Sequence, residues 1–363
     1  MSRPIAIAHD YLTQRGGAER VALVMARAFP GAPLYTSLYE PDGTYPELRE
    51  LDIRASFLQP VGPLRRHHRL GLPLFPLAFG RLDPDADVVL ASSSGWAHGI
   101  GGDAARVTYC YTPARWLYRP DQLEPGALAR AGMRVAGPLL RRWDQRQARR
   151  SDRYLTTSRA TAALIDATYG IEAEVLPPPP GLDAVGDVEP VPGVEAGFVL
   201  CVARLLPYKH VDLVVEAMAA IADRQLVIVG DGPRRDAVDA AAARQGKGRV
   251  RHLLAPNDAQ LRWLYAHAGA LATAAEEDYG LTPVEAGLFG VPSVARAAGG
   301  HLETVIDGQT GLLVPDPTPA SFGGALREAL EMRWDPAVIE FQARTRDEAA
   351  FTARLRSIVD DLR

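Results

Sequence analysis

Short apolar runs alternate with helical patterns along the whole chain. In the first half, these runs predict strands at 5–9, 87–92, 106–111, 153–158 and 173–177, with helices at 18–29 and 160–169 among them. In the second half, they predict strands at 197–203, 225–230, 249–254, 269–274 and 292–297, with helices at 211–222, 234–245 and 258–267 between the first four. Nearly continuous apolar strands separated by helices indicate parallel sheets covered on both faces. The pattern predicts an α/β protein with two doubly wound, Rossmann-like domains.

Proline and glycine concentrate in 176–197, which cannot form regular structure over its length. The sequence therefore predicts one domain over 1–180 and a second over 181–335. The stretch 336–363 is helical in pattern, and we expect it to pack back on the first domain. Such domains bind ligands at the carboxyl ends of their strands, so we expect a central cleft between the two.

Composition narrows the class of protein. The chain has 363 residues, of which 47% are hydrophobic and 23% charged, as in globular proteins. A net charge of −4 argues against a nucleic-acid partner. Arginine is unevenly spread: ten arginines and four acids lie between Arg115 and Arg153, and the stretch 65–69 reads RRHHR. A solvated basic face and a contact with an anionic membrane surface both explain these segments.

The two cysteines and the first residues of the sequence indicate in which cellular compartment we expect the protein. Cys110 and Cys201 lie in apolar, strand-like runs, so we expect two buried thiols. A strand pattern begins within the first ten residues, and no apolar run approaches the roughly 20 residues of a membrane span. We expect a cytoplasmic protein, with a peripheral position at the inner face of the membrane left open.

Several glycines lie where a predicted strand ends. Gly16 and Gly17 open a helix after the first strand, where backbone amides attract anions, although a plain turn explains them equally well. Neither a P-loop nor G-x-G-x-x-G is present in that stretch. Gly230 lies in the sequence GDGP, which lacks the third glycine of a dinucleotide motif. We expect Gly230 to form a tight turn at the end of its strand.

Cations and aromatic residues follow other strand ends. Arg204 and Lys209 come after the strand at 197–203, where two cations suit a diphosphate, but solvated surface cations are an alternative. His98 lies in a glycine-rich loop and is either a ligand or a structural histidine. The stretch YCYTPARW mixes aromatic faces, which stack on sugars, with a cation; a buried aromatic cluster is the other interpretation. Its candidates are Tyr111, Arg115 and Trp116.

The stretch EEDYGLTPVEAG, 276–287, places two carboxylates around a turn. Thr282 as N-cap, proline at the first helical position and Glu285 at the third would form a capping box. That interpretation accounts for Glu285 but leaves Glu277 and the turn Asp278–Gly280 unexplained.

Together these stretches resemble the retaining GT-B glycosyltransferases of family 4 over nearly the whole chain. The stretches that carry the resemblance are RGGAERVA, SSSGWAHGI, VARLLPYKHVDLVVEA, VIVGDGP, EEDYGLTPVEAG and AAGGHLETVIDGQTGLLV. The most specific are E-x7-E, from Glu277 to Glu285, and R-x4-K, from Arg204 to Lys209. AHGI and YTPARW look like the subgroup that includes bacterial surface-polysaccharide mannosyltransferases.

The resemblance implies a role for each matching position. Arg204 and Lys209 would hold the donor diphosphate, Glu277 would meet sugar hydroxyls, and Glu285 the nucleotide ribose. His98 would face the sugar from the first, acceptor-side domain. The remaining positions implied in donor binding are Gly16, Gly17, Gly230, Asp278, Tyr279, Gly280, Leu281 and Thr282, and those on the acceptor side are Tyr111, Arg115 and Trp116. Two positions depart from the family pattern: Tyr111 stands where histidine is frequent, and His301 where small residues or proline are usual.

The implied reaction is retaining transfer of a hexose by front-face attack. The resemblance favours GDP-mannose as donor and leaves UDP-sugars open, with a glycan, glycolipid or small molecule as acceptor. Lipid-linked acceptors are included. We expect no metal and no cofactor beyond the nucleotide sugar, which is a co-substrate. A nucleotide-sugar epimerase of the same fold and a non-enzymatic binding protein are the alternatives.

Overall fold

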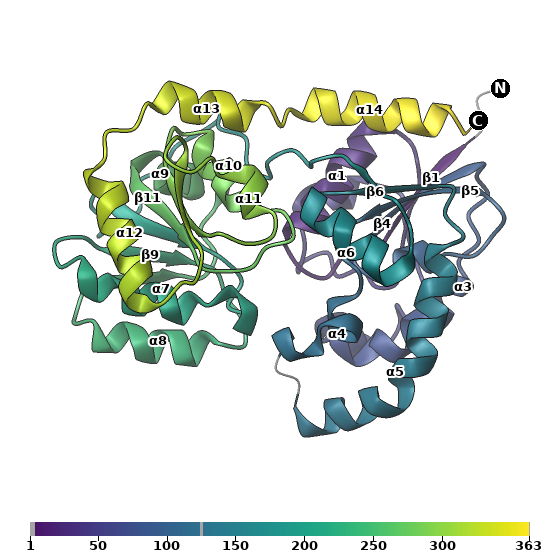
Figure 1. Ribbon diagram of the computed structural model, residues 1–363. Coiled ribbons are helices and arrows are strands. Elements are labelled where there is room, and N and C mark those ends of the chain that lie inside the picture. Colours follow the sequence, from purple (N-terminus) through teal and green to yellow (C-terminus); the bar gives the residue numbers. More distant parts are fainter. Residues whose placement is uncertain (1–3, 124–125, 363) are drawn as a thin grey trace. The chain divides into compact units, whose positions relative to one another are not determined.

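The computed structural model describes residues 4–123 and 126–362, and they form two compact units. The first unit contains the described residues up to Pro179 together with those from Glu348 onward. The second unit runs from Pro180 to Asp347. Figure 1 shows a sheet in each unit with helices packed around it. Each unit is described separately below.

The first unit is built on a seven-stranded sheet with the order β3-β2-β1-β4-β5-β6-β7, in which all neighbours pair in parallel. Its strands are β1 (Ile5–His9), β2 (Leu34–Thr36), β3 (Ile53–Ala55), β4 (Val88–Ser93), β5 (Ala105–Cys110), β6 (Arg153–Thr156) and β7 (Glu174–Val175). Its α-helices are α1 (Gly17–Ala28), α2 (Gly62–Arg66), α3 (Phe75–Gly80), α4 (Arg115–Tyr118), α5 (Ala127–Ala148), α6 (Arg159–Tyr169) and α14 (Glu348–Asp360). Its 3₁₀-helices are η1 (Pro46–Glu50), η2 (His68–Leu74), η3 (Ala97–Gly99) and η4 (Pro120–Leu123).

Alternate residues of β1 serve two different cores. Ile5 and Ile7 belong to a cluster with residues of α1 and α14, such as Phe351. Ala6 and Ala8 belong to a second cluster with residues of η3 and α3. Because successive side chains of a strand point to opposite faces, the two clusters lie on opposite faces of the sheet. This double burial explains why the strands read as continuous apolar runs.

The second unit has a six-stranded parallel sheet with the order β10-β9-β8-β11-β12-β13. Its strands are β8 (Phe198–Val202), β9 (Leu226–Val229), β10 (Val250–Leu253), β11 (Ala268–Thr273), β12 (Ser293–Arg296) and β13 (Gly311–Val314). Its α-helices are α7 (Val211–Ala217), α8 (Arg235–Arg244), α9 (Asp258–His267), α10 (Leu281–Gly287), α11 (His301–Thr304), α12 (Pro319–Glu331) and α13 (Pro336–Arg344). The 3₁₀-helices η5 (Pro207–Lys209) and η6 (Met218–Ala220) flank α7. The predicted fold class, two doubly wound Rossmann-like domains, is confirmed.

The expectation for 336–363 needs correction. The stretch forms two helices, and they belong to different units. Gly287 of α10 lies against Ile339 and Ala343 of α13, so α13 is part of the second unit. Phe351 and Leu355 of α14 join the core under α1, and Arg27 of α1 donates two hydrogen bonds to Glu348. Only α14 therefore packs on the first unit.

Both cysteines are free and buried, as predicted. Burial raises the pKa of the Cys201 thiol to about 12, so this thiol stays protonated and inert. In the described part of the chain, no helix combines the length and the hydropathy that a bilayer crossing requires.

Candidate functional site

In the second unit, polar residues gather where β8 and β11 end. Arg204 follows β8 and is exposed, and Lys209 closes the short helix η5. His210 then adopts a left-handed conformation, with φ of 49°, before α7 begins. It is the one non-glycine residue with positive φ among the residues described. Such strained positions concentrate at functional sites, and this one sets the turn that carries Lys209.

Lys209 and Glu277 form an ion pair at this edge of the sheet. Lys209 Nζ contacts Glu277 Oε1, and the two side chains are 13% and 19% exposed. Burial by itself would lower the pKa of Lys209, but the Glu277 carboxylate outweighs it and raises the pKa above its ordinary value. Lys209 is therefore a permanent cation that is held in place, and the carboxylate beside it is partly open to solvent.

The turn after Glu277 packs tightly on α11. Gly280 has φ of 89°, and a Cβ built there would lie 2.7 Å from His301 Cδ2 and 3.0 Å from Thr304 Oγ1. Gly300 N donates to Glu277 O over 2.8 Å, which ties the turn to the loop before α11. Position 280 therefore requires glycine for two separate reasons, backbone conformation and space.

His301 lies under this turn and is fully buried. Its Nδ1 lies 3.2 Å from Arg296 O, which fixes the proton on Nδ1, and Nε2 has no hydrogen-bond partner. Burial lowers the pKa of His301, so the imidazole is neutral. The departure from the family pattern at this position thus supplies a neutral ring that supports the Gly280 turn.

The capping box predicted around Thr282 is wrong. Helix α10 starts at Leu281, its N-cap is Gly280, and no side chain caps it. Glu285 instead accepts a hydrogen bond from the Tyr265 hydroxyl, over 2.7 Å, and one from Gly181 N, over 3.1 Å. The carboxylate is thus held by α9 and by the chain segment that opens the second unit.

Two more predicted donor-binding residues have structural explanations. Tyr279 is buried in a cluster with residues of α10 and α13, and burial raises its pKa to about 12. Only its backbone remains available to a ligand. A Cβ at Gly230 would lie 2.1 Å from Ala203 O, so this glycine allows the end of β9 to pack against the segment that leads to Arg204.

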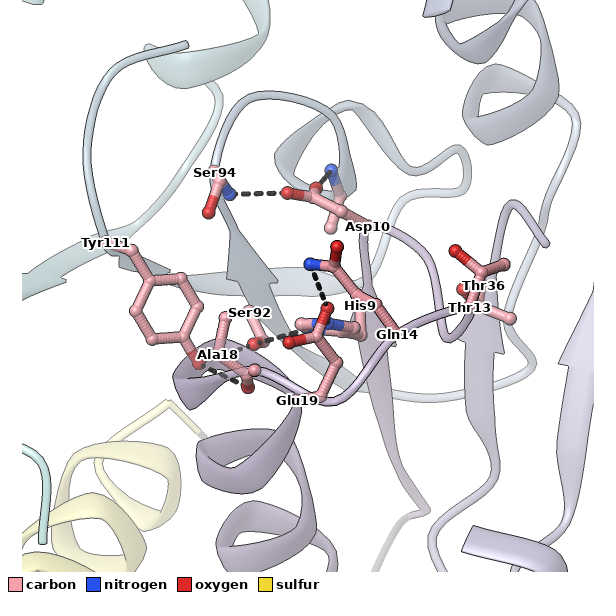
Figure 2. A network of polar contacts seen from close by, with 12 residues as sticks. His9, Asp10, Thr13, Gln14, Ala18, Glu19, Thr36, Ser92, Ser94 and Tyr111 are labelled. Carbon is pink, nitrogen blue, oxygen red and sulfur yellow. Dashed lines mark hydrogen bonds and ion pairs between the residues drawn. The ribbon is translucent and has the colours of Figure 1, made fainter. Parts of the chain in front are cut away.

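In the first unit, a buried polar network connects β1, β4 and Tyr111, which directly follows β5, to the start of α1 (Figure 2). His9 Nδ1 lies 2.9 Å from Ser92 Oγ, which in turn lies 2.9 Å from the Tyr111 hydroxyl. The Tyr111 hydroxyl donates to Ala18 O over 3.2 Å. Tyr111 thus fixes the first turn of α1, and burial raises its pKa.

Glu19 completes this network. His9 Nε2 lies 4.0 Å from Glu19 Oε1, which also accepts a hydrogen bond from Gln14 over 2.9 Å. Burial would raise the pKa of Glu19, but its contacts with His9 and Gln14 outweigh burial and lower it. A Cβ at Gly16 would lie 2.5 Å from Glu19 Oε2. Gly16 is the N-cap of α1 and Gly17 its first residue, so both flank this network.

The Asp10 carboxylate organises the loop that carries His98. It accepts backbone hydrogen bonds from Ser94, Trp96 and Ala97 over 2.6, 3.1 and 2.7 Å. Figure 2 shows this carboxylate pointing toward the loop. Three amides converging on one buried carboxylate fix the loop conformation, a contact that the sequence analysis missed although Asp10 directly follows β1.

The role of His98 toward the sugar stays a prediction, and its side chain lies in the interior of the first unit. His98 is 1% exposed. Its Nδ1 lies 2.9 Å from Ser93 Oγ, and its Nε2 lies 3.0 Å from Asp144 Oδ1 of α5. The Tyr118 hydroxyl donates to the other oxygen of Asp144 over 2.7 Å. In this conformation His98 joins η3 to α5 inside the first unit.

The acceptor-side residues do not form one group. Trp116 stacks on buried Trp96 with ring centroids 4.5 Å apart, and Arg115 is buried and donates to Gln122. Trp116 thus packs in the aromatic cluster around Trp96, Arg115 contacts Gln122, and Tyr111 belongs to the network at α1. The structure thus brings together Lys209, Glu277 and the Gly280 turn, and separately Tyr111 with the start of α1.

In the described residues, no group of three or more His, Cys, Asp or Glu side chains has the arrangement of a metal site. The cations at the second unit's sheet edge are protein side chains, Arg204 and Lys209.

Two family models match this chain. The family described as "Glycosyl transferases group 1" matches residues 191–350, and "Glycosyltransferase Family 4" matches residues 15–183. With its two parallel-sheet units, the chain is a GT-B protein. It belongs to the family 4-type glycosyltransferases.

Among curated relatives, a D-inositol 3-phosphate glycosyltransferase of Kineococcus radiotolerans is 29% identical over 68% of this chain and 62% of its own length. A GDP-mannose-dependent alpha-(1-6)-phosphatidylinositol monomannoside mannosyltransferase of Mycolicibacterium smegmatis is 30% identical over 43% of this chain and 47% of its own. The chain thus spans less than two thirds of either relative. HepE of Anabaena, in a crystal structure with UDP-glucose, superposes with a TM-score of 0.72 at 19% identity, covering 99% of this chain and all of HepE.

Proposed function

We propose that the protein is a retaining glycosyltransferase that transfers a hexose from a nucleotide sugar to a sugar-containing acceptor. The observation that carries the proposal is the Lys209–Glu277 pair beside Arg204, where β8 and β11 end. Cations and a carboxylate at one sheet edge suit a ligand that joins a diphosphate to a hydroxyl-rich ring. A nucleotide sugar is such a ligand.

Arg204 and Lys209 would hold the diphosphate and neutralise the charge that it gains as the glycosidic bond breaks. Charge stabilisation of this kind is usually the largest single contribution to catalysis. The bond between the anomeric carbon and the diphosphate oxygen breaks, and the electron pair leaves with the diphosphate. The acceptor hydroxyl attacks the same face, and its proton passes to the departing diphosphate oxygen. This route retains configuration and needs neither a metal ion nor a protein nucleophile.

Glu277 and Glu285 would contact different parts of the donor. Glu277 is partly exposed beside Lys209, and its carboxylate would accept hydrogen bonds from sugar hydroxyls. Glu285 would accept hydrogen bonds from the ribose, and its contacts with Tyr265 and Gly181 would hold its carboxylate in place for them.

GDP-mannose is our first choice of donor. Support comes from the subgroup resemblance and from the Mycolicibacterium relative, whose name specifies GDP-mannose. The neighbouring HepE structure contains UDP-glucose, which makes UDP-glucose the competing donor. The acceptor is proposed only as a sugar-containing molecule, lipid-linked forms included.

The first experiment is a thermal-shift panel with GDP-mannose, GDP-fucose, UDP-glucose, UDP-N-acetylglucosamine, UDP-glucuronate and NAD. We expect GDP-mannose alone to raise the melting temperature, and calorimetry would then measure its affinity. A shift with a UDP-sugar would identify that UDP-sugar as the donor in place of GDP-mannose, and the proposed transferase activity would stand. Incubation of the stabilising donor without acceptor separates the alternatives, since a 2-epimerised product would identify an epimerase. Absence of any shift, with no transfer or hydrolysis of any donor, would refute the proposal.

A further inference from the structure

Large apolar side chains are exposed mainly in two segments of the first unit. Among the described residues, 13 large hydrophobic side chains are exposed, and seven of them lie at 57–77 or on α5. These seven are Phe57, Val61, Leu70, Leu74, Leu77, Val135 and Leu139. The other six are distributed over the second unit. Concentrated apolar exposure marks an interaction surface, whereas isolated residues need no explanation.

The same two segments carry almost no negative charge. No Asp or Glu occurs between Asp52 and Asp83, whereas that stretch contains five arginines. In the sequence 126–151, Asp144 is the one acid, and it is buried against His98. Seven arginines of that sequence are exposed: Arg130, Arg134, Arg141, Arg142, Arg146, Arg149 and Arg150. Among the described side chains of α5, the exposed ones are therefore arginines and apolar residues, while Gln145 and Gln147 are half-buried.

The apolar and cationic residues of α5 share one face. Val135, Leu139, Arg142 and Arg146 follow one another at intervals of four, three and four residues, which places them on a single stripe of the helix. Val135 and Leu139 are 84% and 71% exposed. Asp144 and Ala148, on the opposite face, are buried. Long arginine side chains can extend past neighbouring apolar residues and keep their charge in water, so a stripe of this kind suits the boundary between lipid headgroups and acyl chains.

Both segments pack on one aromatic cluster. Trp96 lies 5.7 Å from Phe75 of α3 and 5.7 Å from Trp143 of α5, measured between ring centroids. The cluster thus fixes the exposed residues of the two segments on one rigid body.

We propose that segments 57–81 and 130–150 form a basic–apolar face that binds the surface of an anionic phospholipid bilayer. Arg65 has an acidic neighbour, Glu40, at 3.6 Å, but arginines far outnumber acids in the two segments. Such an excess of positive charge complements the negative surface potential of the bilayer. The apolar side chains would enter the region between headgroups and acyl chains, which a water-soluble polyanion does not offer. The apolar component therefore favours a lipid surface over a nucleic acid. The inference does not depend on the proposed transferase reaction.

The test uses the full chain and sedimentation with vesicles of phosphatidylglycerol and phosphatidylcholine, without donor or acceptor. We expect binding that disappears with pure phosphatidylcholine and weakens as salt rises. Arg142→Gln combined with Arg146→Gln should weaken partitioning about 25-fold, since each arginine near a charged surface contributes about fivefold. The matched control, Arg235→Gln with Arg244→Gln on α8, removes the same charge from the second unit and should bind normally.

The apolar component is tested separately. Leu139→Ser should weaken vesicle binding about tenfold, because a buried leucine side chain is lost from the bilayer interface. Phe341→Ser is the control, since Phe341 is 72% exposed on α13 and Leu139 is 71% exposed. Equal effects of the two substitutions, binding to neutral vesicles, or no binding by the wild-type protein would overturn the proposal. The proposal would also be overturned if the protein bound single-stranded RNA as tightly as vesicles and if Leu139→Ser left that RNA affinity unchanged. Donor-induced thermal shifts would remain as they are in each case, so the transferase proposal is judged separately.

Discussion

Lys209 and Glu277 are 68 residues apart in the sequence and form one ion pair at the sheet edge of the second unit. Their spacing in the chain gives no hint of the contact, which arises because β8 and β11 are neighbours in the sheet. The pair places a permanent cation beside a carboxylate, and each side chain keeps some access to solvent.

Lys209→Ala should lower kcat about 100- to 1000-fold, the usual effect of removing one group that stabilises developing negative charge. The fold should survive because Glu277, which loses its contact with Lys209, is 19% exposed and can be solvated. Steady-state kinetics with the identified donor and a thermal melt measure the two effects.

The chain provides its own control, since Lys247 is its only other lysine and is exposed. Lys247→Ala should leave kcat unchanged. Wild-type turnover in Lys209→Ala would remove the diphosphate role from Lys209, and an unfolded variant would show that the ion pair is structural.

Tyr265→Phe should weaken donor binding about tenfold with little change in kcat. The Tyr265 hydroxyl donates to Glu285 over 2.7 Å, and without it the carboxylate loses one anchor and keeps Gly181 N as another. Burial, followed by the neighbouring Glu285 charge, raises the pKa of Tyr265, so the hydroxyl remains a donor at any physiological pH. Tyr265 acts through Glu285 and is a positioning residue.

Separate measurements of KM and kcat distinguish this positioning role of Tyr265 from a general loss of stability. Tyr169→Phe, which changes a buried tyrosine of the first unit, serves as the control and should leave KM unchanged. If Tyr265→Phe lowers kcat and leaves KM as it is, Glu285 does not hold the donor.

Gly280→Ala should destabilise the second unit by about 2–4 kcal/mol and reduce donor binding. Alanine at φ of 89° is strained, and its Cβ would lie 2.7 Å from His301 Cδ2. Gly308→Ala is a matched control, because Gly308 has φ of 72° and open space around its Cβ position.

Urea unfolding of both variants separates the free-energy cost of backbone strain from the cost of the steric collision of the new Cβ. The backbone strain is common to them, so the difference measures the collision with His301 and Thr304. Equal destabilisation would mean that the packing of the Gly280 turn on α11 contributes nothing.

Much of the fold follows from apolar periodicity, and its exceptions have physical reasons. The runs at 5–9 and 225–230 became β1 and β9 because strands buried on both faces are almost entirely apolar. Strands β2 and β3 were missed, since three residues are too few to show a period. Helix α5 was also missed, because its exposed face mixes apolar residues with arginine and it contains Pro138.

The site shows the same division between local and tertiary information. R-x4-K lies in the segment after β8, and E-x7-E runs from the loop after β11 into α10, so local sequence was enough to locate both motifs. The capping box failed because Glu285 is held by Tyr265, a residue of another helix that the local pattern does not include. His98 and Trp116 were ambiguous because a buried aromatic cluster and a sugar-binding surface use the same residue types.

His301 gives the protein a specific pH dependence. The neutral ring is buried under the Gly280 turn, and burial lowers its pKa from the ordinary value of 6.5. In the unfolded chain the same side chain takes up a proton as the pH falls below about 6.5. The unfolded state then binds more protons than the native state, so stability falls as the pH falls. This contribution is absent at pH 8 and reaches at most about 1.4 kcal/mol per pH unit below 6.5.

His301→Asn removes the titrating group and keeps an N–H that can donate to Arg296 O in place of Nδ1. We therefore expect the melting temperature of the variant to fall less than that of the wild-type protein when the pH is lowered from 7.5 to 5.5. His67→Asn, at an exposed position of the first unit, controls for the loss of any histidine and should follow the wild-type curve. Comparison of the three curves isolates the His301 contribution from the carboxylates that titrate in all of them. Parallel curves for wild type and His301→Asn would show that the native ring takes up a proton as readily as the unfolded chain does, and that the turn around Gly280 opens to admit it.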